Sequence, residues 1–239
     1  MITQLKITNN TETPLRSING VFKNDTEFNF VPGINIIVGK NGSGKSTLLK
    51  LLSAYGFCRN HFVSDESEIS NLYGFGEKGI YSGVEVYGDY ELPMFNSLGI
   101  NDEDQYGDKL GLNNGVKAFA YLLNCKNSSQ GESNMLSIQY ILEKMFCGET
   151  YPMPKVPELD KFKVSCEHKI TLLLDEPDKN LDIYNLKEIR GILSNIHPDV
   201  QIIAAIHNPL LIWQLQKVEG INWIELTKHY LKDLKKEFV

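Results

Sequence analysis

The chain has 239 residues, of which 42% are hydrophobic, and a formal net charge of −6. This length and apolar content suit one α/β domain with a helical excursion and would make two independent domains cramped. The acidic balance excludes a sequence-wide attraction to nucleic acid, and leaves open only a local basic face for direct binding.

Three strands are predicted near the start of the chain. Residues 2–8 alternate between apolar and polar side chains, and residues 27–30 supply a second strand. A Val-Pro-Gly turn at 31–33 then leads into residues 34–38, a short β-branched run. We expect these strands to cluster ahead of the loop that follows.

That loop, GKNGSGKST at residues 39–47, matches a complete phosphate-binding motif. Bare backbone N–H groups must wrap a polyphosphate, and a Cβ at the glycines would obstruct the wrap. Lys45 is placed to reach the β- and γ-phosphates and Ser46 to offer its hydroxyl to Mg²⁺, at the positive end of a leucine-rich helix. An accidental glycine turn is rejected because the flanking strand and helix are both present. The predicted nucleotide-binding residues of the loop are Gly39, Asn41, Gly42, Ser43, Gly44, Lys45, Ser46 and Thr47.

The middle of the chain is less regular. Residues 56–115 are rich in Gly, Asn, Asp and Tyr, with strand-like pieces at 79–86 and 90–94. From residue 116 the apolar spacing becomes helical, and after a pause a second helix is predicted from Ser129 to Phe146. Three prolines in residues 148–167 forbid a regular helix, so we interpret that segment as a surface excursion.

The last third returns to a strand–helix–strand order. An apolar strand at 169–174 runs into Asp175 and Glu176, a helix is predicted over 183–196, and a strand over 200–206 ends at His207. Polar residues at the ends of parallel strands are typical of a doubly wound sheet, which binds its ligands at that edge. Lys228 to Lys236 form a mildly basic tail that we interpret as a solvated helix face.

The motifs together resemble those of the ABC-type ATPases, and within them are most similar to the small RecF-like and OLD-like ATPases. The similarity covers the loop with its strand and nearly all of residues 127–226, while residues 53–126 are unmatched. The motifs in chain order are GKNGSGKST at 39–47, SQGES at 129–133, LLLDEP at 172–177, NLD at 180–182 and IHNP at 206–209.

This resemblance implies an α/β P-loop NTPase fold, with a mostly parallel sheet flanked by helices. An antiparallel N-terminal β-subdomain and a helical signature subdomain are expected to join it. The resemblance further implies a single domain over residues 1–239, built from lobes at 1–97, 98–167 and 168–239.

The resemblance also assigns the two carboxylates after the apolar strand. Asp175 is expected to hold the Mg²⁺ shell and Glu176 to polarise the attacking water, a contribution of about 10² to 10⁴ in rate. The alternative is that the pair only caps the turn at Pro177.

The S-x-G-E segment resembles the family signature, which contacts the γ-phosphate held by another protomer. Ser129, Gly131 and Glu132 would therefore bind ATP across a homodimer. A capping box, in which Ser129 and Glu132 only start a helix, explains the same letters without any function.

Six further residues are assigned or considered through the resemblance. Asp182 resembles the loop that crosses the dimer interface, or is a helix N-cap. His207 resembles the switch histidine that bonds the γ-phosphate, or is structural. Arg16 resembles an early arginine that approaches the phosphates. Gln105 is the only glutamine-loop candidate before the signature and stays unassigned. Phe22 and Phe28 are considered as an adenine platform.

The function implied is an ATP-hydrolysing switch, in which ATP and Mg²⁺ join two protomers and Lys45, Glu176 and His207 carry out hydrolysis. The resemblance suggests control of a separate effector, nuclease-like or toxin-like, in DNA maintenance or in defence against phage and plasmids. A transporter ATPase subunit is the first alternative; it predicts an S-G-G-Q signature and a clear glutamine loop. A nucleotide sensor or scaffold that does not turn over is the second.

The location expected from the sequence is the cytoplasm. No run approaches the roughly 18 apolar residues of a membrane span, so no membrane insertion is predicted. The cysteines show no C-x-x-C pairing, and the first residues, MITQLKITNN, contain no apolar signal core.

Overall fold

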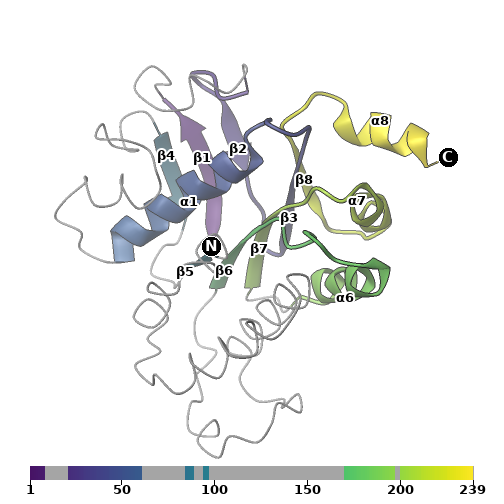
Figure 1. Ribbon diagram of the computed structural model, residues 1–239. Helices are drawn as coiled ribbons and strands as arrows, with labels where there is room; N and C mark the ends of the chain where they lie inside the picture. Colours follow the sequence, from purple (N-terminus) through teal and green to yellow (C-terminus); the bar gives the residue numbers. More distant parts are fainter. Residues whose placement is uncertain (9–20, 61–83, 89–93, 97–169, 197–199, 239) are drawn as a thin grey trace, which may run out of the picture.

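The computed structural model describes residues 1–8, 21–60, 84–88, 94–96, 170–196 and 200–238. Two sheets organise this part of the chain (Figure 1). One has five strands in the order β5-β6-β7-β3-β8 and the other has three in the order β2-β1-β4. The strands are β1 (Ile2–Ile7), β2 (Glu27–Asn29), β3 (Ile34–Val38), β4 (Val84–Gly88), β5 (Met94–Asn96), β6 (Ile170–Asp175), β7 (Val200–Ala205) and β8 (Asn222–Glu225). The helices are α1 (Lys45–Asn60), α6 (Ile183–Ser194), α7 (Pro209–Leu215) and α8 (Tyr230–Glu237).

The five-stranded sheet is parallel throughout, and its central strands are buried on both faces. Every residue of β3 and of β7 is buried. This explains why both strands are continuous apolar or β-branched runs rather than alternating ones. The register places Ile36 opposite Ala204 on one side and opposite Trp223 on the other, so β3 is an interior strand.

Two cores cover the two faces of this sheet. On one side α1 and the antiparallel sheet pack over it, and on the other side lie α6 and α7 (Figure 1). The leucines of α1 at 48, 49, 51 and 52 are at most 1% exposed. Since burying a leucine contributes about 1.5–3 kcal/mol, this packing holds α1 and the loop before it against the sheet.

Buried amides join the N-terminal strands to the parallel sheet. Gln201 of β7 is fully buried and bonds both backbone groups of Ile2, at 2.8 and 2.7 Å. Asn35 of β3 is also fully buried and exchanges hydrogen bonds with the backbone of Val31, each 2.8 Å long. Buried polar groups are destabilising unless they are paired, and these pairs fix how the antiparallel sheet sits on the core.

Most predicted elements are confirmed where the structure describes the chain. The strands expected at 2–8, 27–30, 34–38, 169–174 and 200–206, the helix from Lys45 and the helix at 183–196 are present with small shifts at their ends. Of the strand-like pieces at 79–86 and 90–94, residues 84–86 lie in β4 and Met94 lies in β5, while the remaining residues of both pieces lie outside the described part of the chain. The helices predicted between 116 and 146 and the excursion at 148–167 lie outside the described residues.

The suggested adenine platform is wrong for this structure. Phe22 and Phe28 are 1% and 7% exposed, and their rings pack on one another with centroids 5.6 Å apart. Both belong to the core beneath the antiparallel sheet. Neither ring therefore offers an open face to a purine.

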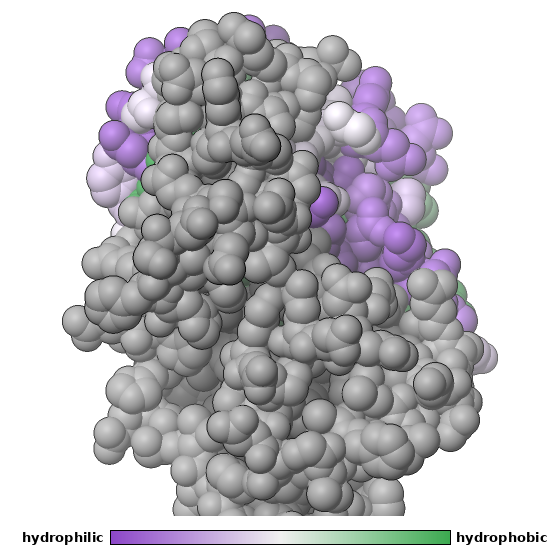
Figure 2. All heavy atoms as spheres, turned by 60° about the vertical axis from the view of Figure 1, so that its left-hand side comes forward, coloured by the Kyte–Doolittle hydropathy of each residue, from purple (hydrophilic) through white to green (hydrophobic). Residues whose placement is uncertain are grey.

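The surface of the described residues is largely polar. Those that reach the face drawn in Figure 2 are mostly hydrophilic. Across the described ranges, the exposed large apolar side chains are Val31, Tyr87, Ile183, Tyr184 and Phe238. None of the described helices is long and apolar enough to cross a membrane.

Candidate functional site

The loop between β3 and α1 is closed on itself by glycine geometry. Gly42 and Gly44 have φ angles of 75° and 96°, which glycine adopts without strain. A Cβ on Gly39 would lie 2.6 Å from the Ser43 hydroxyl oxygen, closer than real side chains approach. The Ser43 N–H donates to the Lys40 carbonyl at 3.1 Å, so the loop curls in the manner needed to wrap an anion.

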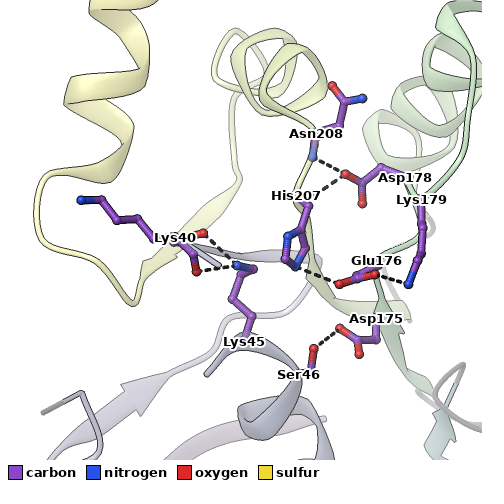
Figure 3. Close-up of polar contacts among 10 residues, drawn as sticks. Lys40, Lys45, Ser46, Asp175, Glu176, Asp178, Lys179, His207 and Asn208 are labelled. Carbon is purple, nitrogen blue, oxygen red and sulfur yellow. Dashed lines mark hydrogen bonds and ion pairs between the residues drawn. The ribbon is translucent and has the colours of Figure 1, made fainter. Parts of the chain in front are cut away.

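Lys45 lies inside this curl. Its Nζ donates to the carbonyls of Gly39 at 2.8 Å and Lys40 at 3.1 Å, and the residue is 3% exposed (Figure 3). Burial lowers the pKa of Lys45, while the nearby carboxylates oppose that shift. The arrangement holds a desolvated cation at the place where the sequence predicts phosphate.

Ser46 and Asp175 meet across the site. The Ser46 hydroxyl, on the first turn of α1, donates to Oδ1 of Asp175, at the end of β6, over 3.0 Å (Figure 3). Burial raises the pKa of Asp175, and the bond from Ser46 works against that rise. A hydroxyl and a carboxylate are hard oxygen donors of the kind Mg²⁺ prefers, with phosphates and water completing its shell. The two residues therefore fit a magnesium ion.

Glu176 follows directly and has an unusual backbone. Its φ is 50°, a left-handed conformation that costs energy in a residue with a side chain. Its N–H donates to the carbonyl of Ala205 at 3.0 Å, which fastens the turn after β6 to the end of β7. In this left-handed conformation the Glu176 carboxylate turns away from the strand and points into the site, toward His207 (Figure 3).

The Glu176 carboxylate lies between two basic side chains (Figure 3). Its Oε2 is 2.9 Å from Nζ of Lys179, and its Oε1 is 3.2 Å from Nε2 of His207, a contact that lacks the alignment of a hydrogen bond. The bond from Lys179 is the main cause of a lowered pKa for Glu176, and the charges of His207, Lys179 and Lys45 add to it. The carboxylate is thus held ionised.

Comparisons with known proteins bear on the fold. A family model described as an AAA domain matches residues 15–86, less than half of the chain. None of the curated proteins matches the sequence. A bacterial ABC transporter cassette solved as a dimer superimposes with a TM-score of 0.50 and 14% identity, over 95% of each chain. A nucleotide-free ATP-binding cassette from an ABC transporter gives a TM-score of 0.48 and 11% identity, over 99% of this chain and 96% of the other.

The chain has the fold of an ATP-binding cassette. This confirms the α/β P-loop fold with parallel and antiparallel sheets that the sequence resemblance implied. The narrower likeness to RecF-like and OLD-like ATPases stays a prediction. The helical signature subdomain lies outside the described residues.

Asp182 has a clear local role in the cassette. Its side chain accepts from the N–H groups of Tyr184 at 2.8 Å and Asn185 at 2.9 Å, and so caps the N-terminus of α6. The helix-capping alternative is therefore correct, and a role at a dimer interface remains a prediction beside it. Next to it, Ile183 and Tyr184 are 51% and 73% exposed.

The remaining predicted residues divide into two groups. Asn41 is exposed on the loop, and Thr47 is partly buried in the first turn of α1. Arg16, Ser129, Gly131, Glu132 and Gln105 lie outside the described residues. The structure thus gathers the loop, the two carboxylates and His207, and does not describe the predicted signature.

Three residues near the site were missed by the sequence analysis. Asp178 is 4% exposed and bonds the backbone of His207, and Lys179 contacts Glu176. Thr227, just after β8, accepts from the Lys40 N–H at 3.0 Å and so supports the loop. The letters D-K after D-E-P were a usable signal for the first two, whereas no local pattern marks Thr227.

Proposed function

We propose that this chain is an ABC-type ATPase that binds ATP with Mg²⁺ and hydrolyses it slowly. The observation that carries the proposal is the bond between Ser46 and Asp175, beside a Glu176 that faces His207. The Ser46–Asp175 bond joins the first turn of α1, directly after the phosphate-binding loop, to the carboxyl end of β6, at the edge where such sheets bind ligands. Lys45 lies in the same cradle.

Each residue has a task that suits its position. Ser46 and Asp175 would hold Mg²⁺, which would supply charge neutralisation at the phosphates. Lys45 leaves the loop carbonyls to bind the β- and γ-phosphates. Glu176, ionised at neutral pH, orients the attacking water and accepts its proton, and His207 donates to the γ-phosphate.

We extend the proposal to a nucleotide-dependent dimer. Ser129, Gly131 and Glu132 of one copy would cap the γ-phosphate bound by the other, and Asp182 would lie at the interface. The exposed pair Ile183 and Tyr184 supports this, because apolar side chains beside a predicted contact are suited to burial by a second copy. A cassette of the same fold has been solved as a dimer, which is consistent with such pairing.

The motifs further suggest that the dimer controls a separate cytoplasmic effector, nuclease-like or toxin-like, in DNA maintenance or in defence against phage and plasmids. This rests on sequence resemblance alone. A sensor that binds ATP with negligible turnover is the second candidate, and one observation favours it. The contacts of Glu176 with Lys179 and His207 lower the pKa of Glu176, which makes its carboxylate a weaker base.

Phosphate release and sedimentation test these proposals. Wild type should release phosphate from ATP above the level of Lys45→Ala, and Glu176→Gln should bind ATP without releasing phosphate. With ATP and Mg²⁺, Glu176→Gln should sediment as a dimer, and with ADP as a monomer. Equal release by wild type and Lys45→Ala would favour the sensor, and a persistent monomer would refute the dimer.

A further inference from the structure

Asp178 links the two turns that carry Glu176 and His207. It lies two residues after Glu176, on the turn that leaves β6, and is 4% exposed. Its Oδ2 accepts the backbone N–H of His207 at 2.9 Å and also that of Asn208 (Figure 3). A single carboxylate oxygen therefore accepts hydrogen bonds from two successive backbone N–H groups of the turn that follows β7.

We infer that Asp178 is a positioning residue for His207, which sets the imidazole relative to Glu176 and the γ-phosphate. The inference rests on the proposed function, since it assigns a residue to the same hydrolytic site. Asp178 does not itself touch the reacting atoms; it acts through the backbone of His207.

Helix capping alone does not account for this carboxylate. Asn208 already caps α7, since its Oδ1 accepts from the N–H groups of Leu210 at 3.0 Å and Leu211 at 3.3 Å. The other oxygen of Asp178, Oδ1, is buried without a hydrogen-bond partner among the described residues. A buried carboxylate with one unpaired oxygen costs folding free energy. This is the kind of local cost that functional sites carry.

The charge of Asp178 is felt within the site. Burial raises the pKa of Asp178, and its bonds from the N–H groups of Asn208 and His207 oppose that rise. Its charge in turn favours the protonated form of Lys45 and raises the pKa of Tyr230, on which burial has the larger effect. The charge of Asp178 therefore acts on Lys45 within the candidate site.

Two ties together fix the distance between the strand-end turns. The Glu176 N–H is bonded to the carbonyl of Ala205 at 3.0 Å, and the His207 N–H is bonded to Asp178 at 2.9 Å. With both in place, Nε2 of His207 stands 3.2 Å from Oε1 of Glu176. Without Asp178 the His207 peptide can turn, and a displacement of about 1 Å at a reacting group can cost about 10²-fold in rate.

The kinetic test compares Asp178→Ala and Asp178→Ser with Asn208→Ala. Under single-turnover conditions the Asp178 variants should hydrolyse bound ATP at least about tenfold more slowly, with the Kd for ATP changed by less than about twofold. Asn208→Ala, which removes the α7 cap but keeps the Asp178 contact, should stay near the wild-type rate. A parallel fall in ATP affinity, or an equal loss in Asn208→Ala, would overturn the inference.

A double-mutant comparison asks whether Asp178 acts through His207. In a His207→Ala background, adding Asp178→Ala should change the single-turnover rate by less than about twofold, because the two residues share one effect. The full tenfold loss in that background would show an independent role and overturn the inference.

Backbone hydrogen exchange separates this inference from the proposed function. The amides of His207 and Asn208 should be protected in wild type and exchange at least about tenfold faster in Asp178→Ala, with Asp178→Ser replacing it where the alanine variant does not fold. If wild type releases no more phosphate than Lys45→Ala, the proposed function fails while the exchange result still decides whether Asp178 holds the turn. Unchanged protection in both variants would overturn the inference even in an active enzyme.

Discussion

Gln201 ties the start of the chain to the parallel sheet, and Gln201→Met tests how strongly. Its Oε1 accepts from the Ile2 N–H at 2.8 Å and the Thr171 hydroxyl at 2.9 Å. Its Nε2 donates to the carbonyls of Ile2 at 2.7 Å and Val31 at 2.9 Å. Methionine is similar in length and can neither donate an N–H nor accept as an amide does, so the change removes hydrogen bonds while keeping most of the packing.

The expected loss follows from the groups left unpaired. The Val31 carbonyl keeps its bond from Asn35, at 2.8 Å, whereas both backbone groups of Ile2 and the hydroxyl of Thr171 lose their partner. Each buried unsatisfied group costs about 1–3 kcal/mol, and the added apolar burial offsets part of this. We therefore expect Gln201→Met to lower the free energy of unfolding by about 3–5 kcal/mol, a large share of the 5–15 kcal/mol typical of a domain.

Urea denaturation followed by tryptophan fluorescence measures this loss, provided that the transition is two-state and the m-value is unchanged. Gln4→Met is the matched control: Gln4 is also a strand glutamine, but its bonds to Asn29 at 2.9 Å and Glu27 at 3.3 Å are exposed. The control should stay within about 0.5 kcal/mol of wild type. Equal losses in the two variants, or a loss below about 1 kcal/mol for Gln201→Met, would refute the reasoning.

The other predictions concern the site. Glu176 acts while ionised, so phosphate release falls as the pH drops through the pKa of Glu176. Because Lys179 lowers that pKa, Lys179→Met should move the acid limb of the pH profile of phosphate release to higher pH. An unmoved acid limb would contradict the pairing of Lys179 with Glu176. Thr227→Val removes the acceptor for the Lys40 N–H and should weaken ATP binding by about 2- to 10-fold in equilibrium dialysis, whereas an unchanged Kd would count against loop support. Asp182→Ala should lower the unfolding free energy by about 1 kcal/mol, and Asp182→Ser should restore most of it. If the serine variant also associates normally with ATP, capping is the whole role of Asp182.

The fold could be predicted where burial leaves a mark on the sequence. Strands β3 and β7 are continuous apolar or β-branched runs because both of their faces are covered, and the periodicity of α6 reflects its buried Leu186, Ile189 and Leu193. Strand β8 escaped prediction because it has four residues at the sheet edge, of which only Ile224 is buried, and its partner β3 is distant in sequence. Helix α7 was also missed, although Asn208 before Pro209 is a recognisable helix start.

The candidate site could also be predicted only in part. Ser46, Asp175, Glu176 and His207 stand in ordered motifs whose spacing follows strand ends, so their convergence could be expected from the chain alone. Asp178 could not be found in this way, because its donors lie 29 and 30 positions further along, and only the pairing of β6 with β7 brings them together. What a motif encodes is the group that faces the ligand, while the groups that support it from behind depend on tertiary contacts.

The contacts of His207 and Lys45 carry a consequence for the proposed switch. Lys45 is buried and donates to two carbonyls, and His207 contacts the Glu176 carboxylate, so both side chains already have partners within the protein. A γ-phosphate would compete for both. It would offer Lys45 an anionic acceptor in place of neutral carbonyls, and it would offer His207 a hydrogen bond in place of a contact that lacks hydrogen-bond alignment. Binding would then free Glu176 from His207 at the step at which it must act on water, while Lys179 alone continues to hold it. For His207, the contact in the present arrangement and the contact needed in hydrolysis are therefore alternatives, and the exchange between them depends on the third phosphate, which is the difference between ATP and ADP.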